Sequence, residues 1–274
     1  RSGNSPESIG AYDLFENNVD DITQIVITCN KDGDLAKRCV NNEKNMLVLM
    51  PEKSNDKSFA MTSSFSCMTL ATLLIFDIEN IEKNKEFVEI VSSQAEEILD
   101  NRWSEIKQLV DYESERVVYL GSGTLKGLCQ EMALKNLELT SGQVTTICES
   151  VLGFRHGPKS IINDKTLVII MATNEEYTKL YDIDLIKEIH NDLGNHKLAV
   201  ITYENDEIMK ENCSNYICVN GKTIPNIYKI FNYMIFGQMF GYLSSLKLNI
   251  SPDNPRPDGT VNRVVKGVVI HQYK

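Results

Sequence analysis

Short apolar runs rich in β-branched residues alternate with longer segments of helical period along most of the chain. The runs that we predict as strands are 24–29, 46–50, 116–120, 144–148, 167–171, 198–202 and 216–219. Alternation of strand and helix is typical of an α/β protein whose sheets are largely parallel. The 274 residues contain 42% hydrophobic residues, enough to bury a core, and the length allows one large or two ordinary domains.

An internal repeat divides the chain into two related lobes. Segments 11–32 and 180–206 share a helix, a turn and a strand that ends in Ile-Thr, and in each copy a short strand and a long apolar helix follow. The stretch 116–171 precedes the second copy but has no counterpart before the first. We therefore expect two related lobes, the first of them truncated at its N-terminus.

A long charged segment without Gly or Pro separates the two copies, and its amphipathic pattern predicts a helical connector. The expected organisation is 1–77 for the C-terminal part of the first domain, 78–112 for the connector, 113–246 for the second domain and 247–274 for a C-terminal tail. The first residue is Arg1 and not Met, which indicates a fragment and leaves open whether a signal peptide precedes it.

Charge and cysteine content restrict the class of partner. With 28 basic and 38 acidic residues, the net charge of -10 repels nucleic acid and anionic membrane surfaces, although local N–H groups and hydroxyls can still hold a small phosphorylated substrate. The longest apolar run, 67–76, is about half of a membrane span. The 7 cysteines, an odd number, favour packed, reduced thiols and a cytoplasmic protein. We expect no metal site and no cofactor, because Cys213 and Cys218 lack a second pair at zinc spacing.

Two loops combine hydroxyl side chains with the start of a helix. Ser2 and Ser5 precede a helix that begins near 11, and Thr62, Ser63 and Ser64 precede the long apolar helix that follows. The N–H groups of a first helical turn lack partners, and the helix dipole favours an anion there. Each loop alone is better explained as an ordinary N-cap, but two in one lobe favour a phosphate site.

A third loop, Gly121 to Gly123, opens a helix on which Glu131, Lys135 and Glu138 share one face at spacings of four and three. Such a stripe is commonly a solvated set of ion pairs. The alternative is a partly buried carboxylate, because apolar residues occupy much of the remaining circumference at Leu128, Ala133, Leu134 and Leu137. The single Gly-x-Gly does not indicate a dinucleotide site.

A further candidate is His156, which lies in a loop between Gly153 and the pair Gly157-Pro158. The constrained backbone predicts an outward-facing imidazole suited to acid–base work. Exposed loop histidines are nevertheless often incidental, so the pattern alone leaves both interpretations open.

Three segments resemble one known family: 119–142 (YLGSGTLKGLCQEMALKNLELTSG), 149–160 (ESVLGFRHGPKS) and 253–271 (DNPRPDGTVNRVVKGVVIH). They are similar, in this order, to AgaS-type tagatose-6-phosphate ketose/aldose isomerases, some of which deaminate galactosamine 6-phosphate. The resemblance implies tandem sugar-isomerase (SIS) domains. Each would be a flavodoxin-like lobe of three α/β/α layers with a parallel sheet, the first lobe lacking its start.

The resemblance also implies roles for the candidate residues, by likeness to the isomerase half of glucosamine-6-phosphate synthase. The implied phosphate-binding residues are Ser2, Ser5, Thr62, Ser63 and Ser64. Glu138 matches the glutamate that shuttles a proton, and His156 matches the ring-opening histidine, which a neighbouring subunit supplies. Lys266 matches a sugar-contacting lysine, in a tail that closes the site. Gly121, Ser122 and Arg263 are further candidates for substrate binding.

The expected function is aldose–ketose isomerisation of a hexose or amino-sugar 6-phosphate with deamination of galactosamine 6-phosphate, in a homodimer or higher homo-oligomer. Two alternatives stay open: a ketose/aldose isomerase that releases no ammonia, and a regulator that binds a sugar phosphate without catalysis. The presence of both Glu138 and His156, without a DNA-binding segment, favours an enzyme.

Overall fold

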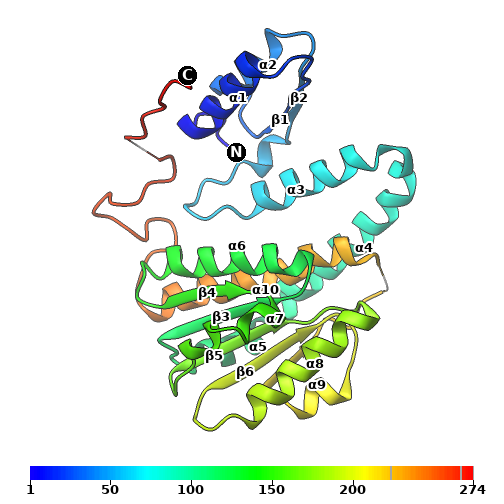
Figure 1. Cartoon of the computed structure of the whole chain (residues 1–274), viewed down its shortest axis with the longest axis vertical. Helices are drawn as coiled ribbons and strands as arrows, with labels where there is room; N and C mark the ends of the chain where they lie inside the picture. The colour runs from blue at the N-terminus through cyan, green and yellow to red at the C-terminus, as the bar shows by residue number, and fades with distance from the viewer. Residues whose placement is uncertain (223, 266, 274) are drawn as a thin grey trace. The chain divides into compact units, whose positions relative to one another are not determined.

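All strands predicted from the sequence are present in the computed structural model, which describes residues 1–222, 224–265 and 267–273 (Figure 1). Each observed end lies within about one residue of the predicted one. The strands are β1 (Ile25–Thr28), β2 (Met46–Leu49), β3 (Arg116–Gly121), β4 (Thr145–Glu149), β5 (Thr166–Met171), β6 (Lys197–Thr202) and β7 (Asn215–Cys218). Every pairing described is parallel, which confirms the predicted α/β class.

The chain divides into two units, Arg1–Ile81 with Arg256–Lys274, and Glu82–Pro255. The first unit contains the parallel pair β1-β2. Its helices are α1 (Pro6–Asn18), α2 (Asp34–Val40), η1 (Glu52–Ser54), α3 (Ser63–Phe76) and η2 (Ile78–Asn80). A small core of Tyr12, Val26 and Cys39 joins α1 and α2 to the strands. The end of β1 lies beside the start of the chain, because Thr28 and Cys29 both donate hydrogen bonds to the carbonyl oxygen of Arg1.

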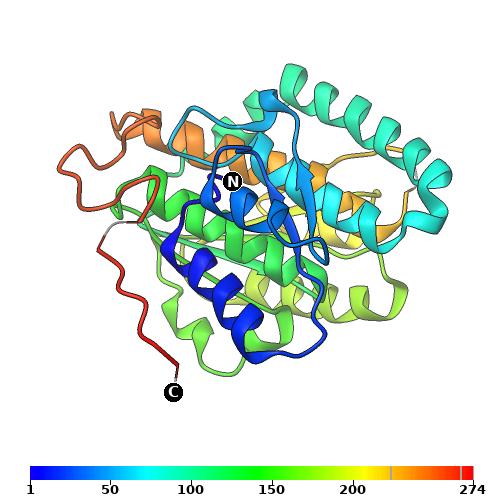
Figure 2. The same ribbon diagram turned by 90° about the horizontal axis from the view of Figure 1, so that it is seen from above.

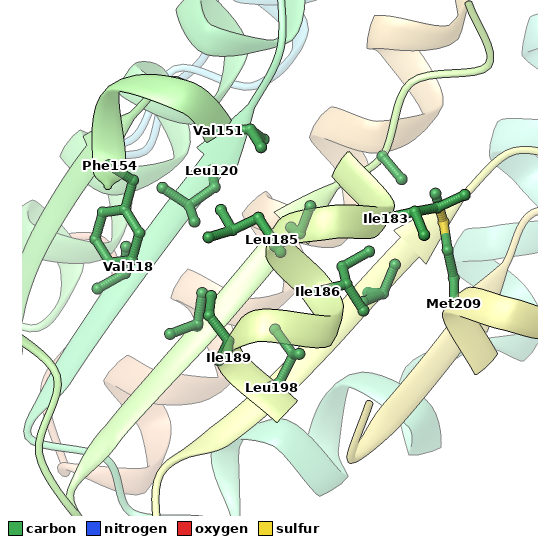
Figure 3. Close-up of a cluster of buried hydrophobic side chains, with 14 residues drawn as sticks. Val118, Leu120, Val151, Phe154, Ile183, Leu185, Ile186, Ile189, Leu198 and Met209 are labelled. Carbon is green, nitrogen blue, oxygen red and sulfur yellow. The ribbon is translucent and has the colours of Figure 1, made fainter. Parts of the chain in front are cut away.

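The second unit is a three-layer α/β/α lobe with strand order β4-β3-β5-β6-β7. Its helices are α4 (Ile81–Asn101), α5 (Trp103–Val110), α6 (Thr124–Leu139), α7 (Val151–Phe154), η3 (Pro158–Ile161), α8 (Glu176–Asn191), α9 (Glu207–Glu211) and α10 (Asn226–Lys247). Side chains alternate between the two faces of the sheet, as pleating requires. Val118 and Leu120 pack against α7, α8 and α9 in a hydrophobic core (Figure 3).

The opposite face of this sheet is covered by α5, α6 and α10. Tyr119 points to that side, where its ring lies 6.5 Å from that of Phe240 on α10 and its hydroxyl accepts a hydrogen bond from Asn136 on α6. The helices α6 and α10 lie side by side (Figures 1 and 2). Their contact is close because Gly237 has no side chain: a Cβ there would lie 2.5 Å from Met132. The helix that carries Glu138 is thus fixed between the sheet and α10.

The repeat found in the sequence has the same order of elements in both copies. The series α1-β1-α2-β2-α3 corresponds to α8-β6-α9-β7-α10. Both pairs, β1-β2 and β6-β7, are parallel and are joined by a short helix. The predicted presence of two related lobes is therefore confirmed at the level of topology.

The segment 78–112 is not one continuous helix. It forms η2, α4 and α5, with a break at Arg102, where φ is -105° and ψ is 9°. Arg102 donates hydrogen bonds to Glu105 and to the carbonyl oxygen of Cys218, at 2.6 and 3.1 Å. The break at Arg102 is accompanied by a contact with Cys218, 116 residues away in the sequence. No Gly or Pro near the break could therefore have been used to predict it. The expected domain boundaries at 77, 112 and 246 stay predictions.

All 7 cysteines are free thiols; Cys29, Cys39 and Cys129 are buried and the others are partly buried. The predicted reduced, packed state agrees with these positions. In the described part of the chain, no single helix is long and apolar enough to cross a membrane, and only the bent pair Ser63–Phe76 with Ile78–Asn101 meets the length and composition test.

Candidate active site

The loop that contains Ser2 and Ser5 is held against the end of β1 and the start of α2. Thr28 Oγ1 donates to the carbonyl oxygen of Arg1 at 2.9 Å, and the N–H of Leu35 donates to that of Gly3 at 3.0 Å. Gly3 has a φ of +67°, a conformation that favours glycine, and a Cβ there would lie 3.3 Å from Thr28 Oγ1. These contacts fix the loop that ends at Ser5, the N-cap residue of α1.

The N-terminus of α1 carries no side-chain cap. Ser5 is the N-cap residue, with φ -66° and ψ 125°, and it makes no capping hydrogen bond, while Pro6 fills the first helical position. Pro at this position loses no hydrogen bond, because the first N–H groups of a helix lack partners within it. The first turn of α1 therefore presents N–H groups and a helix dipole to an external acceptor.

Basic side chains lie near this loop within the first unit. Arg263 donates from Nη1 to the carbonyl oxygen of Lys57 at 2.6 Å and from Nη2 to that of Asp56. Burial lowers the pKa of the Arg1 guanidinium, the charge of Arg263 lowers it further, and Asp56 opposes the change. Arg1 and Arg263 both belong to the first unit, and the charge of Arg263 acts on Arg1. The predicted candidate Arg263 thus anchors the C-terminal segment to the Asp56 loop.

The hydroxyls of the second predicted phosphate loop are engaged by Asp56. Its carboxylate accepts hydrogen bonds from the N–H and Oγ1 of Thr62 at 3.1 and 2.9 Å, from the N–H of Ser63 at 3.0 Å, and from the N–H and Oγ of Ser64 at 2.9 and 2.5 Å. Burial alone raises the pKa of Asp56, but these hydrogen bonds outweigh it and lower the pKa below its ordinary value. In this structure an acid caps α3, and a phosphate would have to displace it.

Glu131, Lys135 and Glu138 form one ion-pair cluster on α6, as their spacing predicted. Lys135 Nζ lies 2.5 Å from Glu138 Oε2 and 3.7 Å from Glu131 Oε1. The lysine side chain is 8% exposed and the two glutamates are 22% and 23% exposed, so the cluster is not a solvated stripe. Burial raises the pKa of Glu131, against the opposing charge of Lys135.

The four apolar residues that share α6 with this cluster differ in their exposure. Leu128 and Ala133 are buried, but Leu134 and Leu137 are 44% and 39% exposed. The alternative of a partly buried carboxylate nevertheless agrees with the structure, because the Glu131 and Glu138 side chains are only 22% and 23% exposed. Both exposed leucines flank Lys135 in the sequence, and they leave an apolar surface beside the cluster.

His156 follows α7 in an exposed loop whose backbone is constrained. Gly157 has a φ of +120°, and Pro158 begins η3. The loop is tied to α8 by ion pairs: Arg155 to Glu188 at 2.7 Å, and Lys159 to Glu188 and Asp192 at 2.5 and 2.7 Å. No side-chain hydrogen bond of His156 is found among the described residues. The loop that carries His156 is therefore held in place by ion pairs, and its side chain is exposed, as predicted.

One chain does not bring Glu138 and His156 together. Helix α6 starts directly after β3 and runs back to the amino end of the sheet, so Glu138 lies near that end. His156 follows β4 and lies at the carboxyl end, where Lys126 at the start of α6 contacts Glu149 at 2.6 Å. The helix alone separates the two ends by roughly 20 Å, at about 1.5 Å per residue. Within one chain, Glu138 and His156 thus lie towards opposite ends of the sheet.

Two further candidates, Gly121 and Ser122, also lie at the carboxyl end of the sheet, directly after β3. Gly121 permits the turn into α6, because a Cβ there would lie 2.8 Å from the backbone of Leu125. Ser122 donates from Oγ to Asp182 at 2.6 Å. Within one chain, Gly121 and Ser122 therefore lie far from Glu138, at the other end of α6. Lys266, the predicted sugar-contacting lysine, lies outside the described residues.

Sequence reasoning missed two acidic residues, Asp56 and Asp182. Asp182 is completely buried in α8 and accepts hydrogen bonds from Ser122 Oγ and from the N–H of Thr173 at 2.6 and 2.9 Å. The available signal was an acid directly before the apolar positions Ile183, Leu185 and Ile186 of an amphipathic helix. For Asp56 the signal was an acid shortly before a run of hydroxyl residues at a helix start.

Asp182 should give the protein an unusual pH dependence. Burial raises its pKa to about 6, against hydrogen bonds from Ser122 and Thr173. The folded state thus binds this proton more tightly than the unfolded state, so the stabilisation is fully present below the ordinary pKa and is lost as the pH rises through about 6. Between about pH 4 and pH 7, the free energy of unfolding should fall by up to roughly 3 kcal/mol relative to Asp182→Asn.

Denaturant titrations at both pH values measure this difference. The control is Asp184→Asn, which removes an exposed acid from the same helix and should leave the pH dependence of the wild type unchanged. An Asp182→Asn variant with the same pH dependence as the control would contradict the assignment.

Comparison with known proteins shows which family the chain belongs to. The family model described as "SIS domain" matches residues 112–242. The D-galactosamine-6-phosphate deaminase AgaS of Shewanella sp. (strain ANA-3) is 42% identical over 273 residues, which are 100% of this chain and 66% of that protein. The protein of the same name from Escherichia coli O157:H7 is 37% identical over 275 residues, with coverage of 100% and 71%. The chain thus spans about two thirds of the length of these relatives.

Solved structures show the same fold. A tagatose-6-phosphate ketose/aldose isomerase from Escherichia coli superposes with a TM-score of 0.88 at 33% identity and covers 100% of this chain and 70% of its own. A Clostridium novyi NT protein, provisionally described as the same enzyme, gives a TM-score of 0.96 at 45% identity, with coverage of 99% and 70%. The C-terminal domain of glucosamine-fructose-6-phosphate aminotransferase from Francisella tularensis shares the fold at 18% identity, with a TM-score of 0.74 and coverage of 92% and 71%.

Proposed function

Because the chain belongs to the AgaS family of SIS-domain proteins, we propose that it is part of a sugar-phosphate enzyme that isomerises and deaminates galactosamine 6-phosphate. The names of the relatives support the substrate class. The structural observation that carries the proposal is the N-terminus of α1, which has no side-chain cap and is preceded by Ser2 and Ser5.

Comparison of the two lobes supports phosphate binding at α1. The N-cap residues Ser5 of α1 and Glu175 of α8 occupy equivalent places in the repeat and have nearly the same backbone angles, -66° and 125° against -71° and 121°. Glu175, however, accepts hydrogen bonds from the N–H groups of Tyr177 and Thr178 and so fills its own helix terminus. Ser5 makes no such bond. The terminus of α1 therefore suits an external dianion, and that of α8 does not.

In the proposed reaction Glu138 moves the proton. The open-chain amino sugar loses the hydrogen on C2 to the carboxylate, and the same group returns a proton to C1. Lys135, whose Nζ lies 2.5 Å from Glu138 Oε2, holds the carboxylate in one orientation. General-base catalysis by a positioned group contributes roughly 10² to 10⁴ in rate.

His156 opens the ring by proton transfer between the ring oxygen and O1, in the proposed mechanism. The shift of the proton from C2 to C1 leaves a ketose with an imine at C2. Water adds to the imine carbon and ammonia leaves, which gives tagatose 6-phosphate. This sequence balances without an oxidant or reductant, and its only co-reactant is water.

The proposed working unit is a homodimer or higher homo-oligomer in which His156 serves the sugar bound by a neighbouring chain. The support is the separation within one chain of Glu138, at the end of α6, from His156, which follows β4 and α7 at the opposite end of the sheet. Cyclic two-fold assemblies are the commonest homo-oligomers, and each contains two equivalent composite sites. Arg263 and Lys266 are proposed sugar contacts from the C-terminal tail, and the free thiols support a reducing, cytoplasmic location.

A second candidate function is ketose/aldose isomerisation without ammonia release, which the names of two structural relatives favour. The deciding experiment supplies galactosamine 6-phosphate and tagatose 6-phosphate separately to the full-length protein and measures ammonia and sugar products. Ammonia from the first substrate supports the deaminase. Interconversion of tagatose 6-phosphate without ammonia release supports the isomerase. If neither substrate is converted, both enzyme functions are contradicted and a non-catalytic regulator that binds a sugar phosphate is the remaining explanation.

The phosphate group should contribute most of the binding energy. Galactosamine without phosphate should bind at least about a hundredfold more weakly, since it lacks several charge-assisted hydrogen bonds. Ser5→Glu should reproduce the self-capped terminus of α8 and weaken phosphate binding at least tenfold more than Ser5→Gln, which has nearly the same shape but no charge. Calorimetric titration with the sugar phosphate measures both effects. Equal affinity of the two variants would contradict a phosphate at α1.

A further inference from the structure

The segment that leads to His156 is fixed to the core of the second unit. Helix α7 has only 4 residues, and two of them, Val151 and Phe154, are completely buried in the hydrophobic core (Figure 3). The N-cap residue Ser150 accepts a hydrogen bond from the N–H of Gly153 at 3.1 Å. The chain therefore has a defined position up to Phe154, two residues before the histidine.

Gly157, directly after His156, has an unusual backbone conformation that no contact of its own enforces. Its φ is +120°, and a Cβ at this position would meet no atom within 4 Å. Glycine in open space can adopt many backbone conformations, so packing at Gly157 does not select this one. The exposed ring of His156 makes no hydrogen bond within the described part of the chain. The position of the imidazole thus depends on contacts on either side of the glycine.

One carboxylate joins the two sides of this glycine. Arg155, directly before His156, contacts Glu188 on α8, with 2.7 Å between Nε and Oε2. Lys159 contacts the same carboxylate from the other side of the loop, with 2.5 Å between Nζ and Oε1. The contact of Lys159 is also a hydrogen bond, whereas that of Arg155 is an ion pair without hydrogen-bond geometry. The ionic bridge through Glu188 therefore closes over residues 156–158.

Glu188 itself lies on a rigid support. Leu185 and Ile186, its neighbours on α8, are completely buried in the core that this helix shares with the sheet (Figure 3). The hydrogen bond from Lys159 lowers the pKa of Glu188 against the effect of burial, so the carboxylate is charged at neutral pH. Asp192, one turn later on the helix, adds a second contact to Lys159 at 2.7 Å. The bridge thus connects the loop to a fixed helix.

The contribution of these ion pairs to folding is small. The side chains of Arg155, Lys159 and Glu188 are 28%, 24% and 36% exposed, and partly exposed ion pairs add little to the free energy of unfolding. Their loss would, however, release the backbone on both sides of Gly157. The bridge therefore acts mainly on the conformation of the loop that carries His156.

We propose that Glu188 is a positioning residue, which holds the loop through Arg155 and Lys159 so that His156 keeps the orientation in which it opens the sugar ring. The inference rests on the proposed function, in which His156 performs that proton transfer. An acid–base group works only within hydrogen-bond reach of the atom that it protonates. A displacement of about 1 Å can slow a reaction by about a hundredfold.

The first test compares Glu188→Gln with the wild type in full-length protein. The assay is ammonia release from galactosamine 6-phosphate or, if no ammonia is released, interconversion of tagatose 6-phosphate. Glutamine keeps the shape of the side chain and removes the charge that both cations share. We expect kcat to fall at least about tenfold and KM to stay within about twofold, because the proposed phosphate contacts lie in the first unit. Asp184→Asn, which removes an exposed acid from the same helix, should keep the wild-type kcat.

The second test asks whether Glu188 acts through His156. If it does, Glu188→Gln should lose its effect in the His156→Ala background, and the double variant should have the same residual kcat as His156→Ala within about twofold. A residue with a merely structural role would lower the residual rate by the same factor as in the wild type. Additive losses would therefore overturn the proposal.

Lys159→Met breaks the bridge from the loop side and replaces Glu188→Gln if that variant does not fold. It should lower kcat at least about tenfold and should likewise have no effect in the His156→Ala background. Folded variants of Glu188 and Lys159 with the wild-type kcat, beside an impaired His156→Ala, would overturn the proposal alone. A wild-type rate in His156→Ala would contradict the proposed function itself, and with it this role of Glu188.

Discussion

Glu138→Gln should slow the exchange of the substrate C2 hydrogen with deuterated water by about 10² or more, while the sugar phosphate still binds. Glutamine keeps the shape of the side chain and removes the base. Lys135 would then lose its partner at 2.5 Å and retain Glu131 at 3.7 Å. Proton exchange followed by NMR measures the rate, and calorimetry measures binding.

The matched variant is Glu131→Gln, which removes the other acid of the same cluster. It should leave most of the exchange rate, because Glu138 and its contact with Lys135 remain. If Glu131→Gln abolished exchange and Glu138→Gln did not, the two assignments would be reversed. If neither variant slowed exchange, the cluster would be a structural group of ion pairs and the base would lie elsewhere.

Mixtures of two inactive variants should regain activity. Glu138→Gln and His156→Ala should each be nearly inactive alone, but a mixed dimer contains one site with both defects and one site with neither. After subunit exchange at equal amounts, activity should approach a quarter of the wild-type value, by counting over a two-fold dimer. The expectation depends on the opposite positions of the two residues along α6 and β4 in one chain.

Subunit exchange needs its own proof, which native mass spectrometry of a size-tagged pair provides. The control mixture combines Glu138→Gln with Glu138→Ala and should show no recovery, since every site then lacks the base. Proven exchange without recovery in the test mixture would mean that His156 does not act across the interface.

The strands β3, β5 and β6 could be predicted closely because each is an almost wholly buried parallel strand. Val118, Val168 and Val200, for example, lie in runs that are apolar on both faces and therefore stand out from the flanking sequence. The break at Arg102 could not be predicted, since its partner, the carbonyl oxygen of Cys218, lies on a distant strand. Helix ends that depend on tertiary contacts carry no local signal.

Part of the candidate site could likewise be predicted from the sequence, and part could not. The shared face of Glu131, Lys135 and Glu138 follows from helical spacing alone. The engagement of Thr62 and Ser64 by Asp56 does not, because the hydroxyl pattern of a helix start is the same whether the hydroxyls bind a ligand or an acid of the chain. Burial of Asp182 was also beyond prediction, since it depends on Ser122 and Thr173 from two other segments.

The difference between Ser5 and Glu175 also bears on how a duplicated lobe diverges. Both residues occupy the N-cap position with almost the same backbone angles, and only Glu175 makes a side-chain capping bond, so the open and the closed terminus differ by one side chain. Neither an insertion nor a rebuilt loop is needed. Two duplicated lobes can thus become asymmetric at a helix terminus through the change of a single residue.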